Sequence, residues 1–170
     1  MAPAKFYEEF VSKEAVLVEL CRDIVTESLD AIAAAIELAA TDLEDVTRAG
    51  LTAFCHSFLD DPRRARVVLI EVVGVSDEVE TERRSYAELY ADVLIQFFQT
   101  VPRDPSLGPI LGTLPVRTTA MALVGGANQA MVGWLLDPEH QSIDELAEVL
   151  TGIYVVVGEW LAATHATARR

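Results

Sequence analysis

The feature that most constrains the fold is the segment 12–40, which contains neither proline nor glycine and repeats its apolar residues at helical spacing. Ser12 is a favourable N-cap, and Glu14 places a negative charge in the first turn. The apolar positions share one broad face of a 3.6-residue wheel: Leu17, Cys21, Ile24, Ala31 and Ala35, flanked by Val18, Val25, Leu29, Ile32 and Ile36. This pattern predicts one long helix that packs against neighbours on several sides, with the rest of the chain folding back against it.

The composition limits the size and the partners of this fold. A chain of 170 residues with 51% hydrophobic side chains can bury one substantial core. Its formal net charge of -14 opposes contact between the body of the protein and nucleic acid or an anionic membrane. No apolar run is long enough to span a bilayer, and no secretory leader is recognisable. Two cysteines in helical patterns suit a reducing compartment, so we expect a cytoplasmic protein.

The remaining segments also show helical periodicity, which predicts an all-α fold. The valine-rich stretch 67–73 has high strand propensity, but no second strand-like segment is available to pair with it. Asp61 and Pro62 supply an N-cap and a first helical position before it, so we predict a buried helix there. Proline and glycine mark residues 101–115 as a loop that could gate an internal cavity. The expected helices after the first cover 42–59, 62–73, 76–100, 116–136 and the chain from 142 onward.

Aromatic side chains at helical spacing suggest an interior that holds a small, mainly apolar ligand. Glu71 is a carboxylate within an apolar run, and it must reach solvent, pair with an arginine such as Arg64, or face a polar ligand. Asn128 lies on an apolar helix face, so it bonds across a helix contact or points into the pocket. The candidate ligand-binding residues are Phe54, Phe58, Glu71, Tyr86, Tyr90, Phe97 and Asn128.

The last two predicted helices carry more apolar surface than one core requires. A seam of small residues along 116–136 permits close approach of another helix. The terminal helix has two apolar stripes, of which one serves the core and the second needs a partner. The candidate interface residues are Ala122, Gly126 and Gly133 on the first helix and Val149, Ile153, Val156 and Trp160 on the second.

The N-terminal segment carries a pattern of aromatic residues followed by a helix cap: Phe6, Tyr7, Phe10, Ser12, Lys13, Glu14, Val16 and Leu17. This pattern resembles the end of the helix-turn-helix of TetR-family transcriptional regulators, where the recognition helix joins the regulatory domain. The resemblance implies that residues 1–11 are a remnant of the DNA-binding domain and that 12–170 form a ligand-binding and dimerisation domain. It further implies that Tyr7 and Lys13 contact phosphates and that Lys5 faces bases.

The resemblance extends to the C-terminal half, where 123–138 look like the penultimate helix of that family. In TetR-like proteins the last two helices of each subunit form a four-helix bundle, so a homodimer is implied. By this resemblance, the two helices that normally precede the recognition helix would lie before the first residue of this sequence or be lost, and we expect an operator to be bound only with those helices present. We therefore expect a TetR-like regulator, a repressor whose small effector shifts the long helix from Ser12. The alternative is a small-molecule-binding and dimerisation module that never touches DNA.

Several chemistries find no support in the sequence. It contains no Cys/His cluster at metal-binding spacing, no phosphate-binding glycine loop after a strand, and no nucleophile elbow. His56 stands alone without a second ligand at such spacing. We therefore expect no metal, no cofactor and no enzymatic activity.

Overall fold

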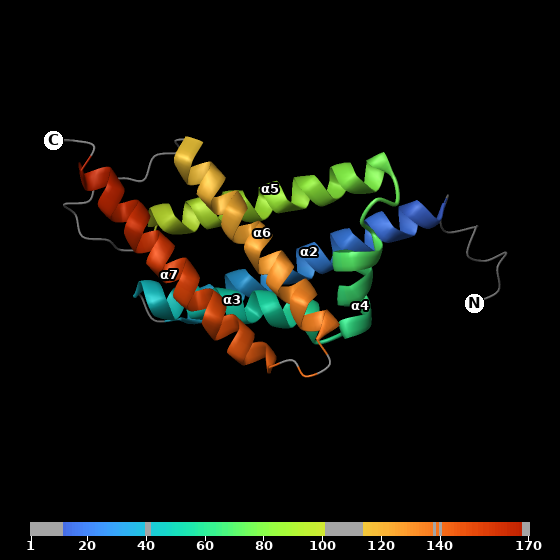
Figure 1. Cartoon of the computed structure of the whole chain (residues 1–170), viewed down its shortest axis with the longest axis horizontal. Helices are drawn as coiled ribbons and strands as arrows, with labels where there is room; N and C mark the ends of the chain where they lie inside the picture. Colours follow the sequence, from blue (N-terminus) through green and yellow to red (C-terminus); the bar gives the residue numbers. More distant parts are fainter. Residues whose placement is uncertain (1–11, 40–41, 101–113, 138, 140, 168–170) are drawn as a thin grey trace.

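The computed structural model describes residues 12–39, 42–100, 114–137, 139 and 141–167. The described residues contain six α-helices and one π-helical turn, and no strand, which confirms the all-α prediction (Figure 1). None of the described helices is both long enough and apolar enough to cross a membrane. Lys5, Tyr7 and the rest of 1–11 lie outside the described residues, as do residues 101–113 of the expected loop 101–115. The last two residues of that expected loop are helical, because α6 begins at Leu114. The elements are α2 (Lys13–Leu38), α3 (Leu43–Leu59), α4 (Pro62–Arg66), η1 (Val67–Glu71), α5 (Asp77–Thr100), α6 (Leu114–Leu136) and α7 (Ile143–Thr167).

Helix α2 begins where the sequence predicts, because the Ser12 hydroxyl accepts a hydrogen bond from the backbone N–H of Ala15 at 3.1 Å. It packs against α3, α5 and η1, with Ile24 and Ser28 fully buried. The prediction that the whole chain folds against α2 is only partly right. Helix α3 lies between α2 and α7, and α6 packs chiefly on α5 (Figure 1). Much of α2 is exposed or half-buried, so it forms one wall of the body instead of its centre.

The core forms where α3, α6 and α7 meet. Helix α3 contributes Phe54, Cys55, Phe58 and Leu59, and α6 contributes Met131, all of them buried. The α6–α7 connection is fixed by Trp134, whose indole N–H donates to the backbone carbonyl of Gln141 at 2.6 Å. Burial of this apolar surface is the main stabilising contribution to the fold.

The segment after α3 is helical, as predicted, but less buried than expected. Asp61 caps α4 by accepting from the backbone N–H of Arg63 at 3.1 Å. The helix then widens into the π turn η1. Only Ala65, Val68 and Val72 are buried, whereas the Val73 side chain is 56% exposed. The segment therefore presents one narrow apolar face to the core and leaves its other residues toward solvent.

His56 links the end of α3 to the start of α7. Its Nδ1 lies 2.8 Å from an oxygen of Asp60, and its Nε2 lies 3.0 Å from an oxygen of Asp144. Since a carboxylate acts only as an acceptor, this geometry favours an imidazole with protons on both nitrogens. The hydrogen bond to Asp144, followed by that to Asp60, raises the pKa of His56 above its usual 6.5.

We expect this link to make stability depend on pH. A pKa raised in the folded state stabilises the protein fully below the unfolded value near 6.5, and the contribution is lost as the pH rises through the folded pKa. The melting temperature should therefore fall across that interval in the wild type. The fall should be smaller in His56→Gln, which keeps polar contacts but cannot be charged. Thermal unfolding at a series of pH values measures both slopes, and equal slopes would show that His56 is not the titrating group.

Candidate ligand-binding site

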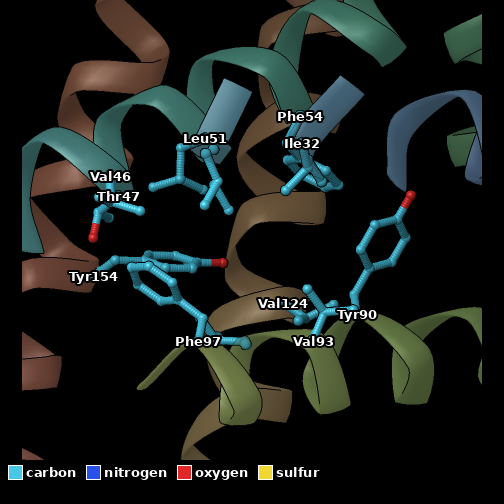
Figure 2. A pocket seen from close by; sticks show the side chains of 13 residues that line it. Ile32, Val46, Thr47, Leu51, Phe54, Tyr90, Val93, Phe97, Val124 and Tyr154 are labelled. Atoms are coloured by element: carbon cyan, nitrogen blue, oxygen red, sulfur yellow. The ribbon is translucent and has the colours of Figure 1, made fainter. Parts of the chain in front are cut away.

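An apolar cavity lies between five of the described helices (Figure 2). Its volume is about 90 Å³. Helices α2 and α3 form one wall, α5 forms the opposite wall, and α6 and α7 each contribute one residue. The lining residues are Ile32 and Ile36 from α2; Val46, Thr47, Gly50, Leu51 and Phe54 from α3; Tyr90, Val93, Leu94 and Phe97 from α5; Val124 from α6; and Tyr154 from α7.

Gly50 of α3 contributes a small part of this space. A Cβ at Gly50 would lie 3.5 Å from Cδ1 of Ile36, so the missing side chain leaves room beside α2. Thr47 presents its methyl group, since its hydroxyl donates to the Leu43 carbonyl at 2.6 Å. Phe54 meets the Tyr90 ring edge to face, with ring centroids 5.3 Å apart. These contacts give the cavity a rigid, apolar lining without any charged side chain.

Tyr154 brings a polar atom into this apolar space. Its side chain is only 6% exposed, and Figure 2 shows its hydroxyl pointing toward the middle of the cavity. Burial, followed by the neighbouring Cys55, raises the pKa of Tyr154, so the hydroxyl stays protonated. It can both donate and accept a hydrogen bond.

The Tyr90 hydroxyl points the other way, out of the cavity and toward α2 (Figure 2). It is buried near the hydroxyl of Ser28, and neither group makes a hydrogen bond with the described residues. Burial raises the pKa of Tyr90 to about 12, an effect that the Ser28 hydroxyl partly offsets. The two hydroxyls are therefore close enough to interact but do not meet hydrogen-bond geometry. Tyr90 contributes its ring to the cavity, whereas Tyr154 contributes its hydroxyl.

Of the seven residues predicted to bind a ligand, Phe54, Tyr90 and Phe97 line the cavity. Phe58 does not: it packs into the core, with its ring centroid 5.1 Å from that of Phe54. Tyr86 lies one turn before Tyr90 on α5 and falls beyond the end of the cavity. Burial, followed by Glu82, raises its pKa.

Glu71 and Asn128 also lie away from the cavity. Glu71 is exposed to solvent and pairs with Arg66 at 3.4 Å. It therefore reaches solvent and pairs with an arginine, as two of the three alternatives proposed, and it does not face a ligand in the cavity. The reason is geometric: the buried face of this segment passes through Val68 and Val72, which leaves Glu71 on the outer side. Asn128 is half-buried one turn beyond Val124 and does not reach the lining.

Sequence periodicity alone missed the polar group in the site. Tyr154 belongs to the apolar stripe of the last helix that also contains Leu150 and Leu161, and such a stripe normally indicates core packing. A tyrosine in place of leucine or phenylalanine was the available signal, because a buried hydroxyl needs a partner. Within the described residues, no three histidine, cysteine or acidic side chains come together at metal-binding distance.

A second feature is the uncovered face of α6 and α7, which lie in front of α2 and α3 in Figure 1. We call it the α6/α7 face and define it by the exposed residues Ala122, Gly126, Gly133, Val149, Ile153, Val156 and Trp160. On α7 the exposed fractions are 56% for Val149, 48% for Ile153, 63% for Val156 and 55% for Trp160. On α6, an added Cβ at Gly126 or Gly133 would meet nothing within 4 Å. All seven predicted interface residues thus lie at the surface of the single chain.

Comparison with known proteins does not point to a function. No protein-family model matches the chain, and no curated protein matches it. The apolar cavity with its inward-facing tyrosine and the exposed α6/α7 face are therefore the two features from which a function has to be inferred.

Proposed function

We propose that this protein is a homodimeric, TetR-like transcriptional regulator that binds a small, mainly apolar effector in the cavity described above. The observation that carries the proposal is the position of α2. Ile32 and Ile36 form one wall of the cavity, and α2 begins directly after the segment that resembles the end of a DNA-reading head. An effector that displaces Ile32 and Ile36 therefore moves α2, the helix that would connect to the DNA-binding domain.

The packing of α2 supports a pivoting movement. Near its N-terminal end, Val18 packs with Val72 and Val79 in a small cluster of buried residues. Ile32 and Ile36, nearer the other end, are only half-buried. An effector that binds better when α2 is displaced at Ile32 shifts the population toward that state. The pivot at Val18 then changes the direction in which the N-terminus of α2 points.

The proposed partner at the α6/α7 face is a second copy of the chain. Each copy carries a net charge of -14, so two copies can associate only through a surface with few carboxylates. Helix α6 meets this requirement because residues 118–136 contain no charged side chain. The same surface on both copies would make a two-fold symmetric interface.

A second candidate function is a ligand-binding, dimeric module that does not contact DNA. The exposed side of α2 favours this alternative, since Glu19, Asp23, Glu27 and Asp30 would repel phosphates. Under the first proposal, operator binding requires the two helices that precede the recognition helix in the family. The fluorescence anisotropy of labelled promoter DNA, titrated with the protein with and without an extended N-terminus, distinguishes the two functions. The regulator binds the DNA when the extension is present, whereas the module does not bind it in either form.

Movement of α2 is the sharper test. Spin labels at the exposed Lys13, introduced as Lys13→Cys in a Cys21→Ser background, report the separation of the two α2 N-termini in a dimer. Cys55 can remain, because it is fully buried and burial raises its pKa to about 12. We expect any compound that raises the melting temperature through this cavity to change the distance measured by pulsed EPR. An unchanged distance with bound compound would reject the regulator and leave the module.

The matched control fills the cavity from within. Gly50→Leu places a side chain against Ile32 and Ile36, where a bound compound would lie. This variant should no longer respond to the compound, either in melting temperature or in label separation. A response that persists in Gly50→Leu would mean that the compound acts from another site.

A further inference from the structure

We infer that the effector is an uncharged, mainly apolar molecule with one hydroxyl or carbonyl group, which hydrogen-bonds to the Tyr154 hydroxyl inside the cavity. This inference rests on the proposed function, in which the cavity holds the effector. It goes further by naming the chemical class of the ligand and the group that orients it.

The Tyr154 hydroxyl is the only polar lining group available to a ligand among the described residues. The Thr47 hydroxyl is already engaged with the Leu43 carbonyl, and the Tyr90 hydroxyl points toward α2. The Tyr154 side chain is only 6% exposed, and its hydroxyl points into the cavity (Figure 2). A hydroxyl that faces an apolar space can gain a hydrogen bond when a ligand oxygen lies at the cavity centre.

The lining excludes charged ligands. No acidic or basic side chain reaches the cavity, so a carboxylate or an ammonium group would lose its hydration without gaining a counter-charge. The tyrosine cannot compensate, since burial keeps its hydroxyl protonated. A neutral molecule loses only the hydration of its single polar group, which Tyr154 replaces.

The size of the cavity limits the ligand to a short chain or a single ring. An apolar cavity of about 150 Å³ holds benzene in other proteins. The volume of about 90 Å³ found here is smaller. A ring with one or two substituents would therefore have to displace the half-buried side chains of Ile32 and Ile36, which is the movement that the proposed function requires. The rings of Phe54 and Tyr90 add aromatic surface to the cavity wall against which such a ring can pack.

Two probes that differ by one hydroxyl group test this inference: toluene and 4-methylphenol. Titrations followed by the methyl NMR signals of Ile32, Leu51 and Val124 report binding inside the cavity. We compare the dissociation constant of toluene with that of 4-methylphenol as a ratio. The apolar contribution to binding is nearly the same for both probes, so it largely cancels in this ratio. We expect this ratio to fall by roughly 5- to 10-fold in Tyr154→Phe, because one hydrogen bond is lost. Tyr86→Phe, a matched change outside the cavity, should leave the ratio unaltered.

Each alternative result has a distinct meaning. If both probes bind but Tyr154→Phe leaves the ratio unchanged, the role of Tyr154 is overturned while the ligand-binding function stands. A fall in Tyr90→Phe instead would move the hydrogen bond to Tyr90 and overturn the inference in the same way. If neither probe shifts the cavity methyl signals of the wild type, both the inference and the proposed function of the cavity fail. Binding of 4-methylbenzoate at neutral pH would contradict the restriction to uncharged ligands. Unfolding curves of each variant confirm that it is folded.

Discussion

Val156→Glu is expected to convert the dimer into a monomer. Val156 is the most exposed of the four apolar residues on α7 that belong to the α6/α7 face, at 63% in the single chain. In a two-fold symmetric interface each copy contributes the substituted residue, so two new carboxylates would be buried near one another. Chains that already carry -14 each gain no compensating charge. We expect the dimer dissociation constant to rise at least about 100-fold.

Sedimentation equilibrium over a range of protein concentrations measures this change. The matched control is Leu38→Glu, because Leu38 is an apolar residue with 89% exposure at the end of α2, away from the α6/α7 face. This control adds the same charge and should remain a dimer. A monomeric wild type, or a Val156→Glu variant that stays dimeric, would show that the α6/α7 face does not join two copies.

Within the same face, Trp160 and the glycines of α6 are expected to act differently. Trp160 is 55% exposed and offers a large aromatic surface of the kind that often dominates an interface energetically. Gly126 and Gly133 contribute little area of their own. Their value lies in the open space beside them, which lets a neighbouring helix approach the backbone of α6 closely.

Local sequence signals predicted the helices and most of their ends. An exception is α3, for which a capping box of Thr41 and Glu44 is expected from the sequence, whereas the N-cap is Asp42, which accepts from the backbone N–H of Asp45 at 3.0 Å. Ser12 caps α2. Ser142 and Glu145 form a reciprocal cap at the start of α7. The Ser142 N–H donates to the Glu145 carboxylate at 2.8 Å, and the Glu145 N–H donates to the Ser142 hydroxyl at 3.2 Å. The valine-rich stretch folds as a helix despite its strand propensity, because no strand is available to it within the described chain. These features depend on neighbours within a few residues, which a sequence displays directly.

The candidate site could be predicted only in part, since it depends on how helices cross. A helical wheel places Phe54 and Phe58 on one face of α3, but one lines the cavity and the other packs into the core one turn further on. The same wheel placed Tyr154 in a core stripe without showing that its hydroxyl would face an empty space. Gly50 lies on the same side of α3 as Phe54, but the gap that it leaves beside α2 follows only from its distance to Ile36, which a sequence does not display.

The most crowded of the described glycines gives the second large prediction: Gly158→Val should lower the free energy of unfolding by about 1–3 kcal/mol. A Cβ at Gly158 would lie 2.9 Å from Cε1 of Phe98, a distance that requires one of the two groups to move. Phe98 cannot move easily, because it is only 3% exposed in the core between α5 and α7. Urea unfolding at one fixed protein concentration measures the change, since dissociation of a dimer would otherwise contribute.

Two further variants separate this steric effect from helix propensity. Gly50→Ala introduces a methyl group at an ordinary distance of 3.5 Å from Ile36, so it should stabilise α3 by roughly 0.5–1 kcal/mol. Gly158→Ala gains the same propensity but places its methyl group against Phe98, and it should not stabilise the protein. Phe98→Leu shortens the opposing side chain, so Gly158→Ala should cost less in that background than in the wild type. Gly158→Ala could stabilise the wild type as much as Gly50→Ala only if the added methyl group found free space beside Phe98. That result would show that Gly158 and Phe98 do not pack as closely as the structure describes.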